Sequence, residues 1–381
     1  MLPKKLQKKI EERTQNNSLR KLGGSADLID FSSNDYLGFS KNETIYIRAL
    51  EILEEYNLKQ NGAAGSRLLS GNHTLYSLTE TQITNFHNAE AALVFNSGYD
   101  ANLGFFSSVP QRGDVIFYDE LCHASIRDGI RMSHATSVKF IHNDLEDLKR
   151  KCQAEHSRSL NDTTEVYLVT ESVFSMDGDS PDLLAFSDFC AENNIHLIID
   201  EAHAVGVLGK HGVGLVQELG IENDVFARIV TFGKALGCHG AAILGASVLK
   251  QYLVNFSRSL IYTTALPPHT LATITAAYEM LSKTLQIEKL YQIISLVQSQ
   301  IAALQLSASF ISSNTAIQSC IVPGNNHVKN LSETLKKEGF DIKPILSPTV
   351  PEGQERLRIC IHSFNTEDQI KKMVSLLKEH L

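Results

Sequence analysis

The sequence predicts an α/β fold, in which a mostly parallel sheet lies between two layers of helices and is followed by a smaller α+β domain. Between about residues 50 and 245, short β-rich runs alternate with helical stretches. These runs are short and mostly apolar, as is typical of strands that are buried on both faces. Beyond residue 267 the spacing of the apolar residues becomes helical. Strands and helices that alternate in this way are typical of a three-layer α/β domain.

The elements of the large domain are expected in a simple order. Residues 3–18 form a charged amphipathic stretch that predicts a helix, and Leu28–Ser32 is expected to be extended. Seven strands are then predicted, namely Ala91–Phe95, Asp114–Tyr118, Ser137–Ile141, Val166–Thr170, His196–Ile199, Arg228–Phe232 and Ala241–Leu244. The segment Pro267–Leu304 contains little Gly or Pro and predicts one long helix that leaves the large domain.

The C-terminal part predicts a smaller domain of mixed composition. Strands are expected near Ala316–Val322 and Arg356–His362, and helices near His327–Glu338 and Thr366–Leu381. We therefore expect three parts. Residues 1–45 are an N-terminal helix and a segment that joins the small domain and the active site, residues 46–270 are the large domain, and residues 271–381 are the small α+β domain.

Composition limits the classes of function. The chain has 381 residues and a formal charge of -8. A negative net charge disfavours binding to nucleic acid or to an anionic membrane. Its six cysteines form no C-x-x-C pair, so neither a metal site nor a disulfide framework is indicated, and a reducing cytoplasm is expected. No apolar h-region follows the basic first residues, and no apolar run approaches the ~18 residues that span a bilayer.

Chemically useful side chains follow three of the predicted strands. One strand ends at Asp200, with His203 three residues later. A second ends near Thr231, which is followed by Lys234 between two glycines. A third is followed by Gly98 at the start of a helix. Open α/β sheets bind their ligands at the carboxyl ends of their strands, so we expect these residues to share one site.

This set of residues suits pyridoxal phosphate (PLP). Lys234 can form a Schiff base with the cofactor and then move protons at the substrate α-carbon. Asp200 can face the pyridine nitrogen and keep it protonated. Gly98 and Thr231 can supply amide and hydroxyl donors to the phosphate, and His123 can stack on the ring. Each residue also has a plainer interpretation, as a helix cap, a surface lysine or a packed histidine, but their combination in this order favours the cofactor.

Two other classes of enzyme fail on sequence grounds. The run Asp200-Glu-Ala-His203 also spells the acidic box of nucleic-acid-dependent ATPases, but those need an upstream phosphate loop. Lys234 instead lies downstream, is followed by Ala235 and lacks the first glycine of that loop. A zinc hydrolase would need ligands at metal spacing, and the pair Cys238-His239 has no partner motif.

The chain resembles the α-oxoamine synthases, a family of fold-type I PLP enzymes, from about Arg20 to its C-terminus. The matching stretches are Phe31-Ser-Ser-Asn-Asp-Tyr-Leu-Gly38, Gly65-Ser-Arg-Leu-Leu-Ser-Gly-Asn72, Asp119-Glu-Leu-Cys-His-Ala-Ser125, Thr170-Glu-Ser-Val-Phe-Ser-Met-Asp-Gly178, Asp200-Glu-Ala-His-Ala-Val-Gly206, Thr231-Phe-Gly-Lys-Ala-Leu-Gly237, Tyr262-Thr-Thr-Ala-Leu-Pro-Pro268 and Arg356-Leu-Arg358. The resemblance implies decarboxylative condensation of an amino acid with an acyl-CoA in a homodimer whose active sites lie at the subunit interface.

The resemblance also implies a role for each matching residue. Lys234, Asp200, His203 and His123 would be catalytic, with His123 stacked on the ring. Ser175 and His203 would bond the 3-oxygen of the cofactor, and Thr231 with the amides of Gly98 and Tyr99 would hold its phosphate. Thr263 or Thr264 would reach the phosphate bound in the partner subunit, and Asn34 and Arg358 would bind the substrate carboxylate.

The substrates are a finer question. The short chain and the segment Asn17–Lys21 are most like family members that join a pimeloyl thioester, on CoA or a carrier protein, to L-alanine in biotin synthesis. Members that use glycine with acetyl-CoA, serine with long-chain acyl-CoA, or form 5-aminolevulinate are the alternatives, as is a non-catalytic structural homologue. The distal carboxylate of a pimeloyl group needs a cation when it is buried, and Arg20 is the candidate by family position, with Lys21 beside it. Such charges are otherwise simply solvated.

Two departures from the family pattern could alter the substrate pocket. The first is Ser363-Phe-Asn365, after the last predicted strand, where members commonly carry a small pair followed by His. The second is Cys238-His239, after the lysine loop. Neither departure removes a catalytic group.

Overall fold

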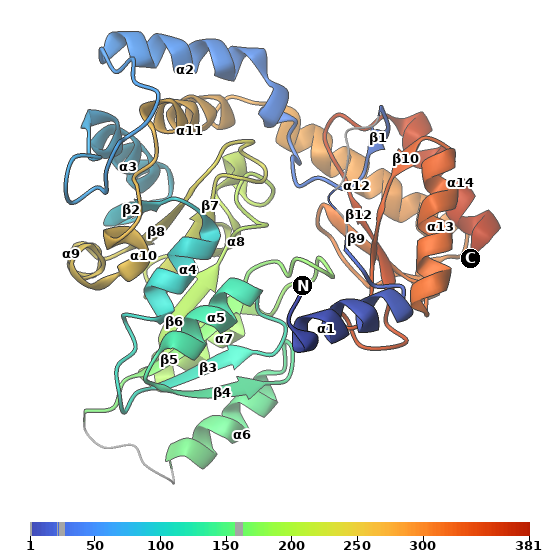
Figure 1. Ribbon diagram of the computed structural model, residues 1–381, viewed down its shortest axis with the longest axis horizontal. Helices are drawn as coiled ribbons and strands as arrows, with labels where there is room; N and C mark the ends of the chain where they lie inside the picture. The colour runs from blue at the N-terminus through green and yellow to red at the C-terminus, as the bar shows by residue number, and fades with distance from the viewer. Residues whose placement is uncertain (1, 21, 23–26, 157–162) are drawn as a thin grey trace. The chain divides into compact units, whose positions relative to one another are not determined.

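The computed structural model describes residues 2–20, 22, 27–156 and 163–381, drawn in colour in Figure 1. The chain divides into two compact units. The larger unit consists of Leu37–Ser175 and Ser180–Ile287. The smaller unit consists of Met1–Tyr36, Met176–Asp179 and Glu288–Leu381, so it is assembled from both ends of the chain.

A seven-stranded sheet forms the centre of the larger unit (Figure 1). Its strands lie in the order β2-β8-β7-β6-β5-β3-β4, and β8 alone among them runs antiparallel to its neighbours. The strands are β2 (Ala91–Phe95), β3 (Val115–Asp119), β4 (Thr136–Phe140), β5 (Val166–Glu171), β6 (His196–Asp200), β7 (Ala227–Thr231) and β8 (Ala241–Gly245). All seven lie within one residue of the strands predicted from the sequence, because their apolar runs are local and short.

Helices pack on both faces of this sheet. Along β6, Ile198 faces one apolar cluster with Phe105 of α4, whereas Leu197 and Ile199 face a second cluster with Phe186 of α7. Successive side chains of a strand point to opposite faces, so the two clusters are the two sides of a three-layer domain. The helices of the unit are α2 (Glu43–Glu55), α3 (Thr74–Phe86), α4 (Gly98–Phe106), α5 (Ala124–Met132), α6 (Leu145–His156), α7 (Leu183–Glu192), α8 (Leu215–Glu218), α9 (Ser247–Phe256), α10 (Arg258–Ile261) and α11 (Pro268–Leu281), with short 3-10 turns η1 (Phe39–Lys41) and η2 (Lys210–Gly212).

The prediction of one long helix over residues 267–304 is wrong. The segment forms two helices, α11 and α12 (Gln286–Ala303), because the side chain of Thr284 accepts a hydrogen bond from Gln286 N at 3.2 Å and begins a new helix there. The expected start of the small domain, residue 271, falls inside α11, which packs against α2 and α3 of the larger unit. The division lies instead between Ile287 and Glu288, in the first turn of α12.

The smaller unit is of α+β type. An antiparallel sheet has the order β11-β12-β9, and β1 pairs in parallel with β10. The strands are β1 (Ile29–Asp30), β9 (Ile317–Ile321), β10 (Phe340–Asp341), β11 (Lys343–Ile345) and β12 (Arg356–Cys360). The helices besides α12 are α1 (Lys4–Gln15), α13 (Asn325–Lys337) and α14 (Glu367–His380), with the 3-10 turn η3 (Ser307–Ser309). This arrangement agrees with the strands and helices predicted for the C-terminal part.

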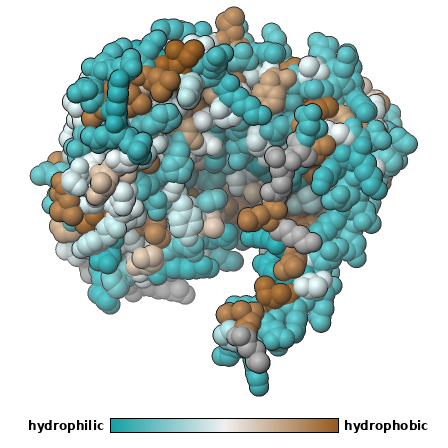
Figure 2. All heavy atoms as spheres, turned by 45° about the horizontal axis from the view of Figure 1, so that its top comes forward, coloured by the Kyte–Doolittle hydropathy of each residue, from teal (hydrophilic) through white to brown (hydrophobic). Residues whose placement is uncertain are grey.

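The surface is mostly hydrophilic on the face drawn in Figure 2, where hydrophobic residues form scattered brown groups. Helix α1 has no buried residue, and Leu6 and Ile10 are about half exposed along one stripe of it. In the part of the chain that the structure describes, no helix combines the length and the apolar character needed to cross a membrane.

Candidate active site

The carboxyl end of β6 presents Asp200. Only 5% of Asp200 is exposed, and its Oδ1 accepts a hydrogen bond from Ala202 N at 2.9 Å. Its other oxygen, Oδ2, accepts from Asn102 Nδ2 of α4 at 2.8 Å. His203, in the turn that follows the strand, is buried to the same degree. A buried carboxylate with two hydrogen-bond donors is a preorganised anionic group, as a cationic ligand would require.

The neighbouring strand β7 delivers Thr231 and the loop of Lys234. Thr231 is its last residue, and its Oγ1 donates to Gly240 O at 3.2 Å across the hairpin to β8. Lys234 is half-buried in this hairpin. Gly237 has φ +63°, and a Cβ there would collide with the backbone of Phe39 and Ser40. The lysine loop therefore lies tightly against the 39–40 segment, which restricts its conformations.

Helix α4 begins beside the end of β7. A Cβ added to Gly98 would lie 3.7 Å from Thr231 Oγ1, so the first turn of the helix and the threonine hydroxyl are neighbours. Ser97 caps the helix by accepting from Asp100 N at 3.1 Å. The first backbone N–H groups of a helix lack intrahelical acceptors, which leaves the amides of Gly98 and Tyr99 suited to an anion such as a phosphate.

Helix α5 brings His123 to the same end of the sheet. His123 is exposed as a residue and caps α5, and its backbone N–H donates to Glu171 Oε1 at 2.6 Å. Glu171 is the last residue of β5 and pairs in register with Asp200. Partial burial lowers the pKa of His123, an effect that the charge of Asp200 opposes and that of Lys234 reinforces.

Glu171 is a buried acid to which the sequence reasoning gave no role. Burial, followed by the charge of the adjacent Asp200 carboxylate, raises the pKa of Glu171 to about 8, although Lys234 acts to lower it. Glu171 belongs to a stretch that matches the family, but only the structure shows that its carboxyl group lies beside Asp200 and accepts a hydrogen bond from the backbone of His123. Asn102 and Ser125, which join Asp200 to His123, were missed for the same reason.

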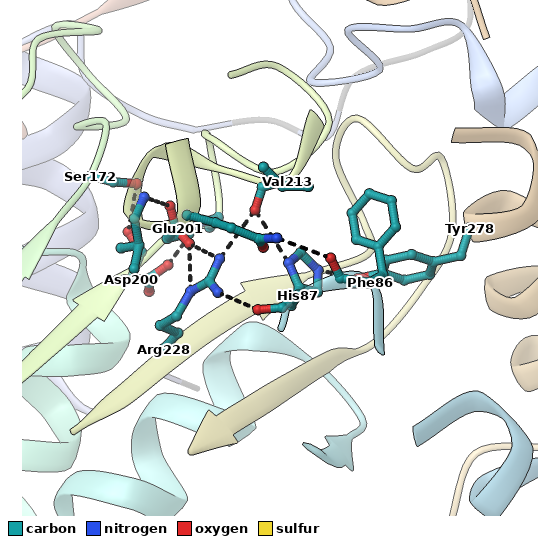
Figure 3. A network of polar contacts seen from close by, with 11 residues as sticks. Phe86, His87, Ser172, Asp200, Glu201, Val213, Arg228 and Tyr278 are labelled. Atoms are coloured by element: carbon teal, nitrogen blue, oxygen red, sulfur yellow. Dashed lines mark hydrogen bonds and ion pairs between the residues drawn. The ribbon is translucent and has the colours of Figure 1, made fainter. Parts of the chain in front are cut away.

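A buried polar network supports the end of β6 from the other face of the sheet (Figure 3). Glu201 Oε2 accepts from Arg228 Nε at 2.8 Å and from Nη2 at 2.5 Å. Arg228 also donates to the carbonyl oxygens of His87 and Val213, at 3.0 and 3.1 Å. The His87 ring lies 2.9 Å from the hydroxyl of Tyr278 on α11. These contacts fix the turn that carries His203.

Ser175 and the predicted threonine pair also belong to the larger unit. Ser175 is half-buried in the turn after β5. The side chain of Asn96, just before α4, donates to Thr263 Oγ1 at 3.1 Å and to Thr264 O at 2.8 Å. Within one chain, this threonine pair therefore lies close to the start of α4.

The residues expected to bind the substrate carboxylate lie in the smaller unit. Arg358 Nη2 donates to Asn34 Oδ1 at 3.0 Å, so the structure brings these two side chains together. Arg20 is exposed and donates to Thr349 Oγ1 at 3.3 Å. Lys21, expected beside it, lies outside the described residues.

The two departures from the family pattern have structural roles. Asn365 Oδ1 accepts from His362 N at 2.8 Å, and its Nδ2 donates to Asp30 O at 3.1 Å, so it fastens a turn of the smaller unit. Phe364 stacks on the His362 ring at a centroid distance of 4.6 Å. Cys238 closes the lysine hairpin through its backbone N–H, which donates to Phe232 O at 2.8 Å.

Comparison with known proteins points to one family. The model described as aminotransferase class I and II matches residues 26–377. Over 363 aligned residues the chain is 41% identical to 8-amino-7-oxononanoate synthase of Emericella nidulans, and the aligned region covers 92% of this chain and 88% of that protein.

Several solved structures resemble this one. A serine palmitoyltransferase (SPT) structure with its PLP internal aldimine has a TM-score of 0.85 and 26% identity, covering 93% of this chain and 87% of the other. The crystal structure of 8-amino-7-oxononanoate synthase from Francisella tularensis has a TM-score of 0.77 and 28% identity, covering 92% of this chain and 97% of the other.

Proposed function

The chain belongs to the aminotransferase class I and II family and, within it, to the α-oxoamine synthases, and from this premise we propose that it condenses L-alanine with a pimeloyl thioester. The reaction releases CO2 and the thiol and gives 8-amino-7-oxononanoate, for biotin synthesis. The chain is a PLP-dependent C-acyltransferase. The observation that carries the substrate assignment is the 41% identity to an 8-amino-7-oxononanoate synthase over 92% of the chain.

The residues at the strand ends fit PLP by the chemistry of their donors. The site combines the amine of Lys234, the buried carboxylate of Asp200 and the hydroxyl of Thr231 beside the first amides of α4. These groups match an aldehyde, a pyridine nitrogen and a phosphate respectively. When it is bound, PLP supplies an electron sink for the α-carbon of the amino acid.

We assign the following roles on this basis. Lys234 Nζ would hold the cofactor and then move a proton at the substrate α-carbon. Asp200 would keep a proton on the pyridine nitrogen, and His123 would lie on the ring face. Ser175 and His203 would bond the 3-oxygen. The amides of Gly98 and Tyr99, with Thr231, would bind the phosphate.

The amino acid needs a partner for its carboxylate, and we assign this role to Arg358 with Asn34. A guanidinium binds a carboxylate through two parallel hydrogen bonds, which gives orientation as well as affinity. The bond from Arg358 Nη2 to Asn34 Oδ1 supports this assignment because it brings the guanidinium and the amide side chain together. The other terminal nitrogen, Nη1, contacts Cys360 Sγ.

We further propose a cytoplasmic homodimer. Leu69 and Tyr262 are 86% and 74% exposed and lie on adjacent segments, since Ala265 N donates to Gly65 O at 2.9 Å. An apolar surface of this kind favours contact with a protein partner, and a second copy is the partner that the family implies. The Thr263–Thr264 pair follows Tyr262 directly, which supports a role for one of the two threonines at the phosphate of the partner subunit.

The test is thiol release over a matrix of amino acids and acyl donors. We expect the highest kcat/KM for L-alanine with pimeloyl-CoA or pimeloyl carrier protein, and none for Lys234→Ala. The SPT structure, with its TM-score of 0.85, makes serine with a long-chain acyl-CoA the second candidate. Faster turnover with that pair, or with glycine and acetyl-CoA, would overturn the pimeloyl assignment.

Arg20 is our candidate for the distal carboxylate of the pimeloyl group. Its guanidinium is exposed and contacts only a threonine hydroxyl among the hydrogen bonds described, so a ligand carboxylate could replace that contact. Arg20→Ala is expected to raise KM for the pimeloyl donor and to spare KM for alanine. Lys5→Ala, which removes another exposed charge near the N-terminus, is the matched control. Equal effects of the two variants would leave Arg20 as a solvated surface charge.

A further inference from the structure

A chain of buried side chains connects Asp200 with His123. Asn102 Nδ2 on α4 donates to Asp200 Oδ2 at 2.8 Å and to Ser125 Oγ on α5 at 3.1 Å. Ser125 Oγ lies 2.7 Å from His123 Nδ1. Asn102 is 2% exposed and Ser125 is 0% exposed. The two side chains are therefore shielded from water and can exchange their hydrogen bonds only with their neighbours.

The close approach of α4 and α5 makes this chain of contacts feasible. Gly129 of α5 lies against α4, where a Cβ would be 2.8 Å from Asn102 O and 2.9 Å from Phe106 Cβ. A larger residue would separate the helices and lengthen the bond between Asn102 and Ser125. The contact is thus built into the packing of the two helices.

The direction of each hydrogen bond follows from its donors. A carboxylate can only accept, so the Asn102 atom that faces Asp200 is the amide nitrogen, and its second N–H points to Ser125. Ser125 Oγ accepts there and has one proton left for His123 Nδ1. The backbone N–H of Ser125 also donates to this nitrogen, at 3.3 Å. Two donors converge on Nδ1, so it carries a lone pair, and the proton of the imidazole is on Nε2.

We propose that Asn102 and Ser125 are positioning residues that hold His123 as the neutral Nε2–H tautomer and tie its orientation to Asp200. The proposal rests on the proposed function only for its catalytic consequence. His123 then offers a fixed hydrogen-bond donor to a carboxylate or carbonyl oxygen of the substrate. It does not act as a general base through Nδ1, and proton transfer at the α-carbon falls to Lys234.

A purely structural role explains Asn102 less well. Its Oδ1 is buried and has no hydrogen-bond partner among the residues that the structure describes. An unsatisfied buried carbonyl costs free energy, and an apolar residue of similar shape would avoid that cost. Partial burial, which lowers the pKa of His123, acts in the same direction as the two donors at Nδ1. The charges that act on the imidazole are those of Asp200, Lys234, Arg127 and Asp128.

The first test is the protonation of the two ring nitrogens of His123. The enzyme is labelled with ¹⁵N-histidine, with and without PLP, and the His123 signals are identified by their loss in His123→Asn. We expect the proton on Nε2 in the wild type, with and without PLP. A proton on Nδ1 in the wild type would overturn the proposal, and this result does not depend on the folding of a Ser125 or Asn102 variant.

The second test removes the hydroxyl group. In Ser125→Ala we expect a mixture of tautomers, a higher pKa of His123 and a KM for the amino acid that is raised by roughly 3- to 10-fold, the equivalent of one hydrogen bond. Ser125→Thr, which keeps the hydroxyl, should restore the wild-type nitrogen signals. Ser172→Ala is the matched control, because its buried hydroxyl donates to the backbone oxygen of Asp200 at 3.3 Å and makes no hydrogen bond to the His123 ring among those of the described residues.

The outcomes separate this inference from the proposed function. If Ser125→Ala leaves the tautomer and the pKa of His123 unchanged, the role of Ser125 and Asn102 is wrong even in an active acyltransferase. If no pair of amino acid and acyl donor releases thiol, the proposed function fails, while the nitrogen signals still decide the tautomer.

Discussion

Two adjacent carboxylates at the end of β6 have different partners because they point to opposite faces of the sheet. Asp200 faces α4, where Asn102 donates to it at 2.8 Å. Glu201 turns to the other face and is neutralised by Arg228 at 2.5–2.8 Å. The side chains of successive residues in a strand point to opposite faces. A shift of one position therefore separates the acid that faces the candidate site from the acid that forms an internal ion pair.

Asp200→Asn tests this assignment at a single residue. The amide keeps the shape and one acceptor oxygen but removes the charge that would face the pyridine nitrogen. We expect the fold to persist, kcat to fall severely and the binding of PLP to weaken by about 1.5–3 kcal/mol in free energy, which is the contribution of a charged hydrogen bond. Cofactor titration and thiol release measure the two effects. Unchanged activity with a stability loss of ~1 kcal/mol would make Asp200 a helix cap only.

At the scale of elements, the turn that leads into α8 depends on one glycine. Gly214 has φ +97°, and a Cβ there would lie 2.7 Å from Glu201 Oε1. This close approach lets the backbone of the turn wrap around the carboxylate, since Val216 N also donates to Oε1 at 3.0 Å. The turn thus connects α8 to the ion pair between β6 and β7.

Gly214→Ala is therefore expected to lower the free energy of unfolding by more than backbone strain alone, which costs about 1–3 kcal/mol at such a conformation. The added methyl group would also push against the paired carboxylate. Gly113→Ala is the control, because Gly113 has φ +99° and nothing within 4 Å of its Cβ position. Denaturant unfolding of both variants measures the difference. Equal losses would show that the contact with Glu201 has no energetic weight.

For the whole molecule, buried titratable groups set the dependence of stability on pH. His87 is fully buried, and burial, followed by the charge of Arg228, lowers its pKa well below the ordinary value. Its Nδ1 faces the carbonyl oxygen of Val213 at 3.2 Å, which requires a proton there, so Nε2 accepts from Tyr278. The native state therefore holds His87 neutral.

Acid should destabilise the protein through His87. As the pH falls below about 6.5, the unfolded chain binds a proton at this residue and the native chain does not. Stability thus falls with pH, by at most about 1.4 kcal/mol per pH unit from this group. The contribution of His87 is measured by the free energy of unfolding of the wild type and of His87→Gln between about pH 5 and pH 8. Parallel pH curves for the two proteins would contradict it.

The sequence by itself determined the elements and the ends of the strands. The apolar runs that became β2 to β8 are local, so their positions follow from composition, and each run places its following residues at the edge of a parallel sheet. Lys234 and Asp200 could be predicted as site residues for this reason. The single helix predicted over 267–304 failed because a side-chain cap at Thr284, rather than the apolar period, decides where α12 begins.

Only the tertiary structure decided which side chains support those residues. Asn102 and Asp200 are 98 residues apart in sequence, and Ser125 stands 23 residues from Asn102. Glu171 meets Asp200 through the register of β5 with β6. No sequence period encodes such contacts, because they depend on strand register and on the distance between two packed helices, which the whole core sets together. The ends of the strands could therefore be predicted from each local stretch of sequence. The hydrogen bonds that orient His123 form only when the elements pack together.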